Sequence, residues 1–291
     1  MQTRAHHFVP QVYLQYFTST PAEANPDKMK IWRLNKNKTT RRSDEARIAK
    51  VAQQRDLYTY RPGEENRVSF EEVFSRWELS YGHTLRALHT APSIDVLLGH
   101  KRHLATFVAF QYVRTAFMRE LLRQYWELQA SDGPPVTTEE LKIGHMSLMM
   151  RDLDKATDVF HRKNWVLLHN ETRALFYTSD TPITIRNPQR GRRTPDLYVT
   201  SKGVEIHFPL SPRLALVMYN QGEYRDEEFD IMAGPVDVEA LNRQQVRWSQ
   251  RYVFSATNDF ALADRMVDTE PELGNPHRQR LFRPDEGGEQ D

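Results

Sequence analysis

Histidine, arginine and aspartate side chains in three separate segments could together cleave a phosphate ester. His6 and His7 stand side by side, directly before a dense apolar segment at residues 8–17. Histidine gains or loses a proton near neutral pH, so either imidazole could act as a general acid or base. The plainer alternative is that one imidazole hydrogen-bonds the backbone and the other faces solvent.

A second set of polar residues lies within a helix that we predict over residues 101–128. Gln111, Arg114 and Thr115 share one face of this helix, and apolar side chains extend that face in both directions. A buried guanidinium requires a carboxylate, backbone carbonyls or an anionic ligand. Arg114 therefore either pairs with a structural carboxylate or contacts a ligand, where it would stabilise negative charge while Gln111 and Thr115 bind substrate.

The third candidate is Asp180, in a Ser-Asp-Thr-Pro sequence that separates two strand-like runs. Clefts commonly form at such strand edges, and a carboxylate there could orient a histidine or hold a divalent metal. Aspartate before Thr-Pro also initiates turns well, so a purely local turn is an equal alternative.

A basic loop follows Asp180. Arg190, Arg192 and Arg193 fall in a segment with glycine and proline, and they could contact the phosphates of a substrate. A solvated loop explains them equally well. The chain has 40 Lys and Arg against 39 Asp and Glu, which gives no general attraction to nucleic acid.

Composition removes several classes of chemistry. The 291 residues include no cysteine, which excludes disulfides, thiol nucleophiles and cysteine-based zinc sites. The sequence patterns of phosphate loops, dinucleotide folds, α/β-hydrolases and zinc proteases are missing too. No cofactor is indicated apart from a divalent metal that Asp180 could hold. Without a long apolar stretch or a signal-peptide core, we expect a cytoplasmic protein that does not enter the membrane.

The elements that must position these groups form a helical block and a strand-rich half. Residues 69–161 carry apolar side chains at steps of three and four, which predicts long amphipathic helices. Residues 164–268 contain short apolar runs bounded by Gly, Pro, Asn and Asp, which are typical of strands, and residues 170–173 suit a hairpin turn between the first two. This order predicts an α+β fold: a central helical block packed on a mainly antiparallel sheet, formed largely by the C-terminal half.

Chain length and composition also predict the domain organisation. The length suits one domain, which we place at residues 1–268. Residues 269–291 are polar and rich in proline and glycine, so we expect a loose tail there.

Taken together, these segments resemble the bacterial domain-of-unknown-function family numbered 4238, over about residues 4–264. The resemblance rests on HHFVPQVYLQYF at the start, DLYTY, QYVRT on the long helix, FYTSDTPI and HFPLSP, in that order. The family pattern falls on His6, His7, Pro10, Tyr13, Leu14, Phe17, Gln111, Arg114, Ser179, Asp180 and Pro182. It implies a fold and a shared site for these polar positions, not an established activity.

The favoured hypothesis is a hydrolase that cleaves nucleic acid or a nucleotide. His6 or His7 would be the general acid and base, Arg114 would stabilise charge on a phosphoryl oxygen, and Asp180 would orient the histidine or hold the metal. Such a nuclease would suit a role in phage defence or as a toxin. One alternative is a non-catalytic module that binds an anion or an acidic partner in the same pocket. The other is a buried network with a purely structural role.

Overall fold

The helical layer comes from the middle of the chain, as the sequence predicts. The computed structural model describes residues 5–19, 25, 28–37, 39–60, 68–130, 135–188, 199–223 and 227–280. The layer contains α2 (Glu71–Thr90), α3 (Ile94–Gly99), α4 (Lys101–Val113), α5 (Ala116–Ala130) and α6 (Thr138–His161). Helix α6 begins with a capping box, since the Thr137 side chain accepts a hydrogen bond from the Glu140 amide while Glu140 accepts one from Thr137.

The helix predicted as continuous over residues 101–128 is interrupted, so that prediction was wrong. Helix α4 ends at Val113 and α5 begins at Ala116. Between them, the Thr115 hydroxyl accepts a hydrogen bond from the Met118 amide at 3.2 Å, which makes Thr115 the N-terminal cap of α5.

Side chains from other elements donate hydrogen bonds to the backbone carbonyls at this break. Nε2 of His145 donates to the Val113 carbonyl at 2.7 Å, and the Tyr58 hydroxyl donates to the Arg114 carbonyl at 2.9 Å. In an uninterrupted helix these two carbonyls would accept amides from one turn further along. Tertiary hydrogen bonds thus replace helical ones, which local sequence patterns cannot reveal.

A five-stranded sheet forms the second layer, with the order β12-β7-β11-β10-β9. Every neighbouring pair in it is antiparallel except β12 and β7, which are parallel. The strands are β7 (Asn164–Asn170), β9 (Thr184–Arg186), β10 (Glu205–Ser211), β11 (Leu214–Tyr219) and β12 (Phe229–Ala233). All of them come from the C-terminal half, which confirms the expected α+β class and the origin of the main sheet.

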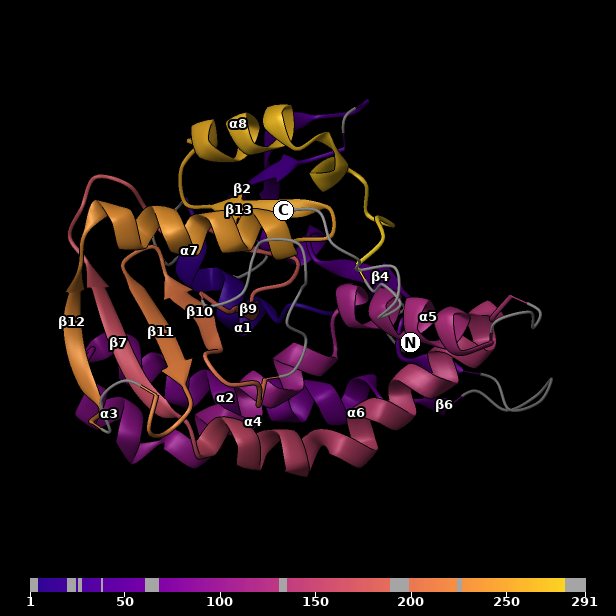
Figure 1. Cartoon of the computed structure of the whole chain (residues 1–291), viewed down its shortest axis with the longest axis horizontal. Coiled ribbons are helices and arrows are strands. Elements are labelled where there is room, and N and C mark those ends of the chain that lie inside the picture. Colours follow the sequence, from indigo (N-terminus) through magenta and orange to yellow (C-terminus); the bar gives the residue numbers. More distant parts are fainter. Residues whose placement is uncertain are drawn as a thin grey trace.

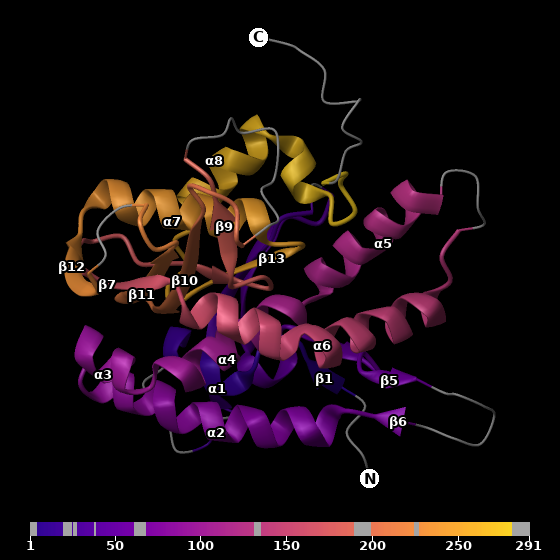
Figure 2. The same cartoon turned by 60° about the horizontal axis from the view of Figure 1, so that its bottom comes forward.

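Both faces of this sheet are covered (Figures 1 and 2). The helical layer packs against one face, and α7 (Pro235–Trp248) packs against the other. Leu168 and Ala215 of the sheet form one buried cluster with Val238 and Leu241 of α7. Burial on both faces explains why β11 and the centre of β7, residues 165–168, are continuously apolar rather than alternating.

A four-stranded antiparallel sheet, β3-β2-β13-β8, joins the two ends of the chain. Its strands are β2 (Lys30–Asn35), β3 (Arg42–Arg47), β8 (Thr178–Ser179) and β13 (Tyr252–Ser255), and α8 (Ala261–Thr269) covers it. The turn at residues 170–173 does not link paired strands, so the predicted hairpin was wrong: β7 pairs with β11 and β12, whereas β8 pairs with β13.

The N-terminal segment runs between the helical layer and the sheets. It contains β1 (Ala5–His7), α1 (Gln11–Leu14) and the 3₁₀ turn η1 (Gln15–Phe17), and β1 pairs with β4 (Gln53–Arg55). The remaining short elements are η3 (Ile48–Lys50), β5 (Thr59–Tyr60), β6 (Val68–Ser69) and η4 (Pro271–Gly274). The fully buried Tyr13 hydroxyl donates to the Pro209 carbonyl at 2.7 Å, which fixes this segment to the sheet.

Residues 270–280 pack onto the body of the fold rather than starting a loose tail. The Arg280 amide donates to the Gln124 side chain on α5 at 2.9 Å, and Gln124 donates to the Arg278 carbonyl at 3.0 Å. The expected tail was therefore wrong for these residues, and residues 281–291 lie outside the described part. No helix in the described ranges has both the length and the apolar composition to cross a bilayer.

Candidate functional site

Arg114 lies at the centre of a network that gathers several of the predicted site residues. Its side chain is completely buried, and Nη1 lies 2.6 Å from Oε1 of Glu78. Nη2 donates to the His7 carbonyl, and Nε donates to the Tyr58 hydroxyl at 3.3 Å. The required anionic partner is therefore present, and it is a carboxylate of the protein itself.

Aromatic rings complete the surroundings of this guanidinium. It lies over the rings of Phe110, at 4.5 Å from the ring centre, and of Tyr58, at 5.5 Å. Burial disfavours the charge, yet Tyr58 and Glu78 together raise the pKa of Arg114 above its ordinary value. Arg114 thus stays a cation inside the protein.

His6 and Gln111 hold the N-terminal segment against the helices. Nδ1 of His6 accepts a hydrogen bond from the Tyr58 amide at 3.0 Å, and the His6 ring stacks on Tyr58. Nε2 of Gln111 donates to the Phe8 carbonyl at 2.9 Å, whereas its Oε1 is buried and has no hydrogen-bond partner among the described residues.

His7 also belongs to this group, and its imidazole is largely buried. Burial and the nearby charge of Arg114 lower the pKa of His7 to about 4, so its imidazole is neutral at pH 7. Within the described residues, Nε2 of His7 is buried without a hydrogen-bond partner. Buried imidazole nitrogens without partners are uncommon, so this atom is a candidate for proton transfer or ligand contact.

Glu78 is the residue that the sequence reasoning missed. It lies on α2 between Phe74 and Tyr81, four residues after one buried aromatic side chain and three before the next. A carboxylate within an apolar helix face has to find a cationic partner. The position of Glu78 within the apolar face of the helix was therefore the sequence signal that could have identified it as the partner of Arg114.

Asp180 belongs to a different set of contacts. Oδ1 accepts the Gln250 amide at 2.8 Å, and Oδ2 accepts the Arg251 and Tyr252 amides at 2.7 Å each. Burial raises the pKa of Asp180, although these hydrogen bonds and nearby Lys36 act in the opposite direction. All hydrogen bonds of the Asp180 side chain in the described structure go to this turn between α7 and β13, so the predicted convergence of His, Arg and Asp occurs only in part.

The remaining predicted residues either stabilise the fold or lie outside the described residues. Thr115 is buried and caps α5. Arg190, Arg192 and Arg193 lie outside the described residues. Among the described residues, no three His, Asp or Glu side chains are grouped closely enough to hold a metal ion, so Asp180 has no partners of that kind there.

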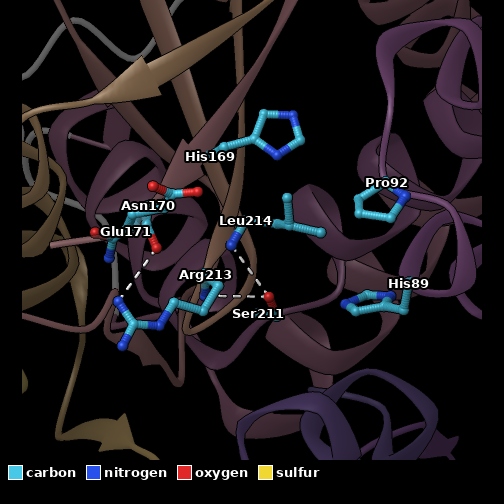
Figure 3. A pocket seen from close by; sticks show the side chains of 8 residues that line it. All are labelled: His89, Pro92, His169, Asn170, Glu171, Ser211, Arg213 and Leu214. Atoms are coloured by element: carbon cyan, nitrogen blue, oxygen red, sulfur yellow. Dashed lines mark hydrogen bonds between the residues drawn. The ribbon is translucent and has the colours of Figure 1, made fainter.

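An open pocket of about 550 Å³ lies elsewhere, where the link between α2 and α3 faces the ends of β7, β10 and β11 (Figure 3). Its lining residues are His89, Pro92, His169, Asn170, Glu171, Ser211, Arg213 and Leu214. None of the site residues predicted from the sequence is among them.

The pocket contains a histidine that is oriented by a carboxylate. Nε2 of His169 lies 2.6 Å from Oδ1 of Asp230, and Oδ2 of Asp230 accepts the Ile94 amide at 3.0 Å. Nδ1 of His169 has no hydrogen-bond partner within the described residues. Asp230 thus fixes the ring and leaves the second nitrogen available, which is the geometry of a general base.

The other polar residues of the pocket are partly engaged by the backbone. The Ser211 hydroxyl accepts the Arg213 and Leu214 amides, and the ring nitrogens of His89 face the Leu85 and Leu210 carbonyls. Nη1 of the exposed Arg213 donates to the Asn170 carbonyl at 3.2 Å.

The donors left on Arg213 can still contact a ligand. Nε and Nη2 of its guanidinium have no hydrogen-bond partner in the part of the chain that the structure describes.

His169 could have been suspected from the sequence as a polar residue at the end of an apolar strand, but Asp230 lies on a short strand, β12, that the pattern did not predict.

Comparison with known proteins identifies the family and nothing closer. No curated protein and no solved structure matches the chain. The family model described as "Protein of unknown function (DUF4238)" matches residues 5–259 and therefore most of the 291-residue chain. The family predicted from the sequence is thereby confirmed, and the chain belongs to the DUF4238 family.

Proposed function

We propose that the protein is a hydrolase that acts on a phosphate-containing substrate, either a nucleic acid or a nucleotide, bound in the pocket. The observation that carries the proposal is the 2.6 Å contact between Nε2 of His169 and Asp230 beside an open cavity. A histidine, an orienting aspartate and an arginine are the chemical set expected from the sequence. Here His169, Asp230 and Arg213 supply it instead of His7, Asp180 and Arg114.

Each of the three residues has a distinct role in the proposal. Nδ1 of His169 takes a proton from a water molecule that attacks the phosphorus atom, and Asp230 stabilises the resulting imidazolium. The P–O bond to the leaving group breaks in the same displacement, the departing oxygen takes a proton from solvent, and the imidazolium returns its proton to solvent. The free donors of Arg213 contact the phosphoryl oxygens, where negative charge develops. Positioned proton transfer of this kind typically contributes about 10²–10⁴-fold to a rate.

The test is a hydrolysis assay with single-stranded RNA and DNA, nucleotides and a chromogenic phosphodiester, each with and without Mg²⁺ or Mn²⁺. We expect His169→Ala and Asp230→Asn to lower kcat by at least about 10²-fold while the protein remains folded. The matched control is His100→Ala, which removes an exposed histidine outside the pocket and should leave the rate unchanged. Absence of turnover across the whole panel would contradict the proposal.

The role predicted from the sequence for His7 and Arg114 stays a prediction, and the same assay examines it. His7→Gln removes the imidazole with its buried, unpartnered Nε2. If this variant folds but loses activity while His169→Ala retains it, the chemistry lies in the Arg114 network and not in the pocket.

The second candidate is a non-catalytic module that binds an anion or an acidic partner in the pocket. The backbone contacts of Ser211 and His89 favour it, because they occupy a hydroxyl and an imidazole that a catalytic pocket would use for proton transfer. It predicts stabilisation by a phosphate compound without turnover, lost in Arg213→Gln. For either function we propose the cytoplasm as the location, and a role in bacterial defence or as a toxin remains a hypothesis.

A further inference from the structure

Three cationic side chains converge on the C-terminal end of α7, and we call them the cation cluster: Lys36, Arg278 and Arg280. Nζ of Lys36 donates to two backbone carbonyls of residues 246–249, at 2.7 and 2.9 Å. Arg280 donates to two carbonyls of the same stretch, both at 3.4 Å, and Arg278 donates to one. Lys36 is completely buried, and Arg280 is 9% exposed.

Among the described residues, the carboxylates around the cation cluster act on it only from a distance. None of its members forms an ion pair with a carboxylate within the described residues. Asp180 lies close enough to affect their pKa values, but its oxygens accept three backbone amides. Glu120 pairs with Arg123, and Glu270 pairs with Arg247. A helix C-terminus contributes only roughly half a negative charge.

Arg280 has an unused donor in this position. Within the described part of the chain, its Nε is buried and has no hydrogen-bond partner. Its guanidinium lies over the Phe117 ring, 4.4 Å from the ring centre. The Phe117 ring covers one face of the guanidinium. The N–H groups along the edge of a guanidinium can bind an oxyanion through two parallel hydrogen bonds.

We propose that the cation cluster is an anion-binding site that takes a phosphate group, with the Arg280 edge and the Lys36 ammonium as its principal donors. The site shares no residue with the pocket, so it goes beyond the proposed function. Burial, together with the charge of Arg278, lowers the pKa of Arg280 to about 9. A bound phosphate would supply negative charge and offset the repulsion within the cluster.

Thermal unfolding of the whole chain, in inorganic phosphate titrated at constant ionic strength, tests this site. Because the proposed pocket also binds phosphoryl oxygens through Arg213, the titration is done in an Arg213→Gln background as well as in the parent protein. We expect phosphate to raise the Tm of both with saturation, and Arg280→Gln to remove the rise in the Arg213→Gln background. Arg243→Gln is the matched control, because Arg243 lies on the same helix in an exposed ion pair with Glu239; it should keep the whole rise. A parallel titration with AMP distinguishes free phosphate from a phosphate ester, and either ligand supports the site.

Variants of the pocket separate this inference from the proposed function. Under our proposal, the phosphate-dependent rise in Tm persists in Arg213→Gln. If Arg213→Gln abolishes the rise and Arg280→Gln keeps it, phosphate binds in the pocket and the inference is overturned. A lower Tm in Arg280→Gln with an unchanged phosphate response means that the cluster only caps α7, which also overturns it. If Arg280→Gln does not fold, Lys36→Met serves as the second variant, with the same expected loss.

Discussion

Arg114 and Glu78 form an ion pair of 2.6 Å in which the arginine is completely buried and the carboxylate keeps 18% of its side-chain exposure. The pair links α2 to the junction of α4 and α5. Through Nη2 of Arg114 it also holds the His7 backbone. One cation therefore joins the N-terminal motif, α2 and the helix break.

Breaking this pair should be strongly destabilising. We expect Glu78→Gln and Arg114→Met each to lower the free energy of unfolding by about 3–5 kcal/mol, since the first leaves the buried Arg114 cation without its counter-charge and the second leaves the Glu78 carboxylate without its cation. The double variant should lose less than the sum of the two. Urea denaturation measures this, with the exposed Arg102–Asp158 pair as control, worth about 0–1 kcal/mol. Additive losses would show that the contact is not energetically coupled.

Acid should destabilise the protein through His145. Its Nε2 donates to Val113 and its Nδ1 accepts from Arg119 at 3.1 Å, so the buried ring is neutral. Burial and the charge of Arg119 lower the pKa of His145 to about 3, below its usual value of 6.5. The unfolded state therefore binds more protons between these values, and the stability present above pH 6.5 falls as the pH drops.

The measurement is the free energy of unfolding at several pH values between 5 and 7.5. His145 should contribute up to about 1.4 kcal/mol per pH unit below 6.5, and His145→Gln should remove that part of the slope. His100→Gln, which alters an exposed histidine, should leave the slope unchanged. An identical slope in parent and His145→Gln would refute the assignment.

Asp180 should act on stability through the turn at residues 250–252. Asp180→Asn retains one carbonyl oxygen but places an NH₂ group toward backbone N–H groups that now donate to the carboxylate. We expect a loss of at least about 2 kcal/mol, because backbone amides that now donate to the buried carboxylate lose an acceptor. Chemical denaturation checks this, and a change below about 0.5 kcal/mol would contradict the role.

Gly144 should resist substitution although it lies inside a helix. A Cβ atom there would lie 2.1 Å from the Trp126 ring on α5. Alanine gains about 1 kcal/mol of helix propensity, but overpacking costs about 1–3 kcal/mol. Gly144→Ala should therefore lower Tm or leave it unchanged. In a Trp126→Leu background the same substitution should raise Tm, and a rise in the parent protein would falsify the close contact.

Local patterns in the sequence determined the class of fold. Apolar spacing of three and four indicated α2 and α6, and short apolar runs indicated β7, β10, β11 and β13. The capping box at Thr137 and the burial of Arg114 also follow from local rules, since they depend on neighbours along one element or on the cost of an unpaired charge.

Only the tertiary structure decided which groups meet. His169 and Asp230 lie 61 positions apart, and they become neighbours because β7 and β12 pair in parallel. The helix break at Arg114 depends on hydrogen bonds from Tyr58 and His145, which come from distant segments. The energy of such contacts depends on the distances between segments that lie far apart in the chain. Those distances are set only when the layers have packed against each other. For that reason the sequence by itself determined that Arg114 needs a carboxylate, backbone carbonyls or an anionic ligand, whereas packing selected Glu78 and the His7 carbonyl.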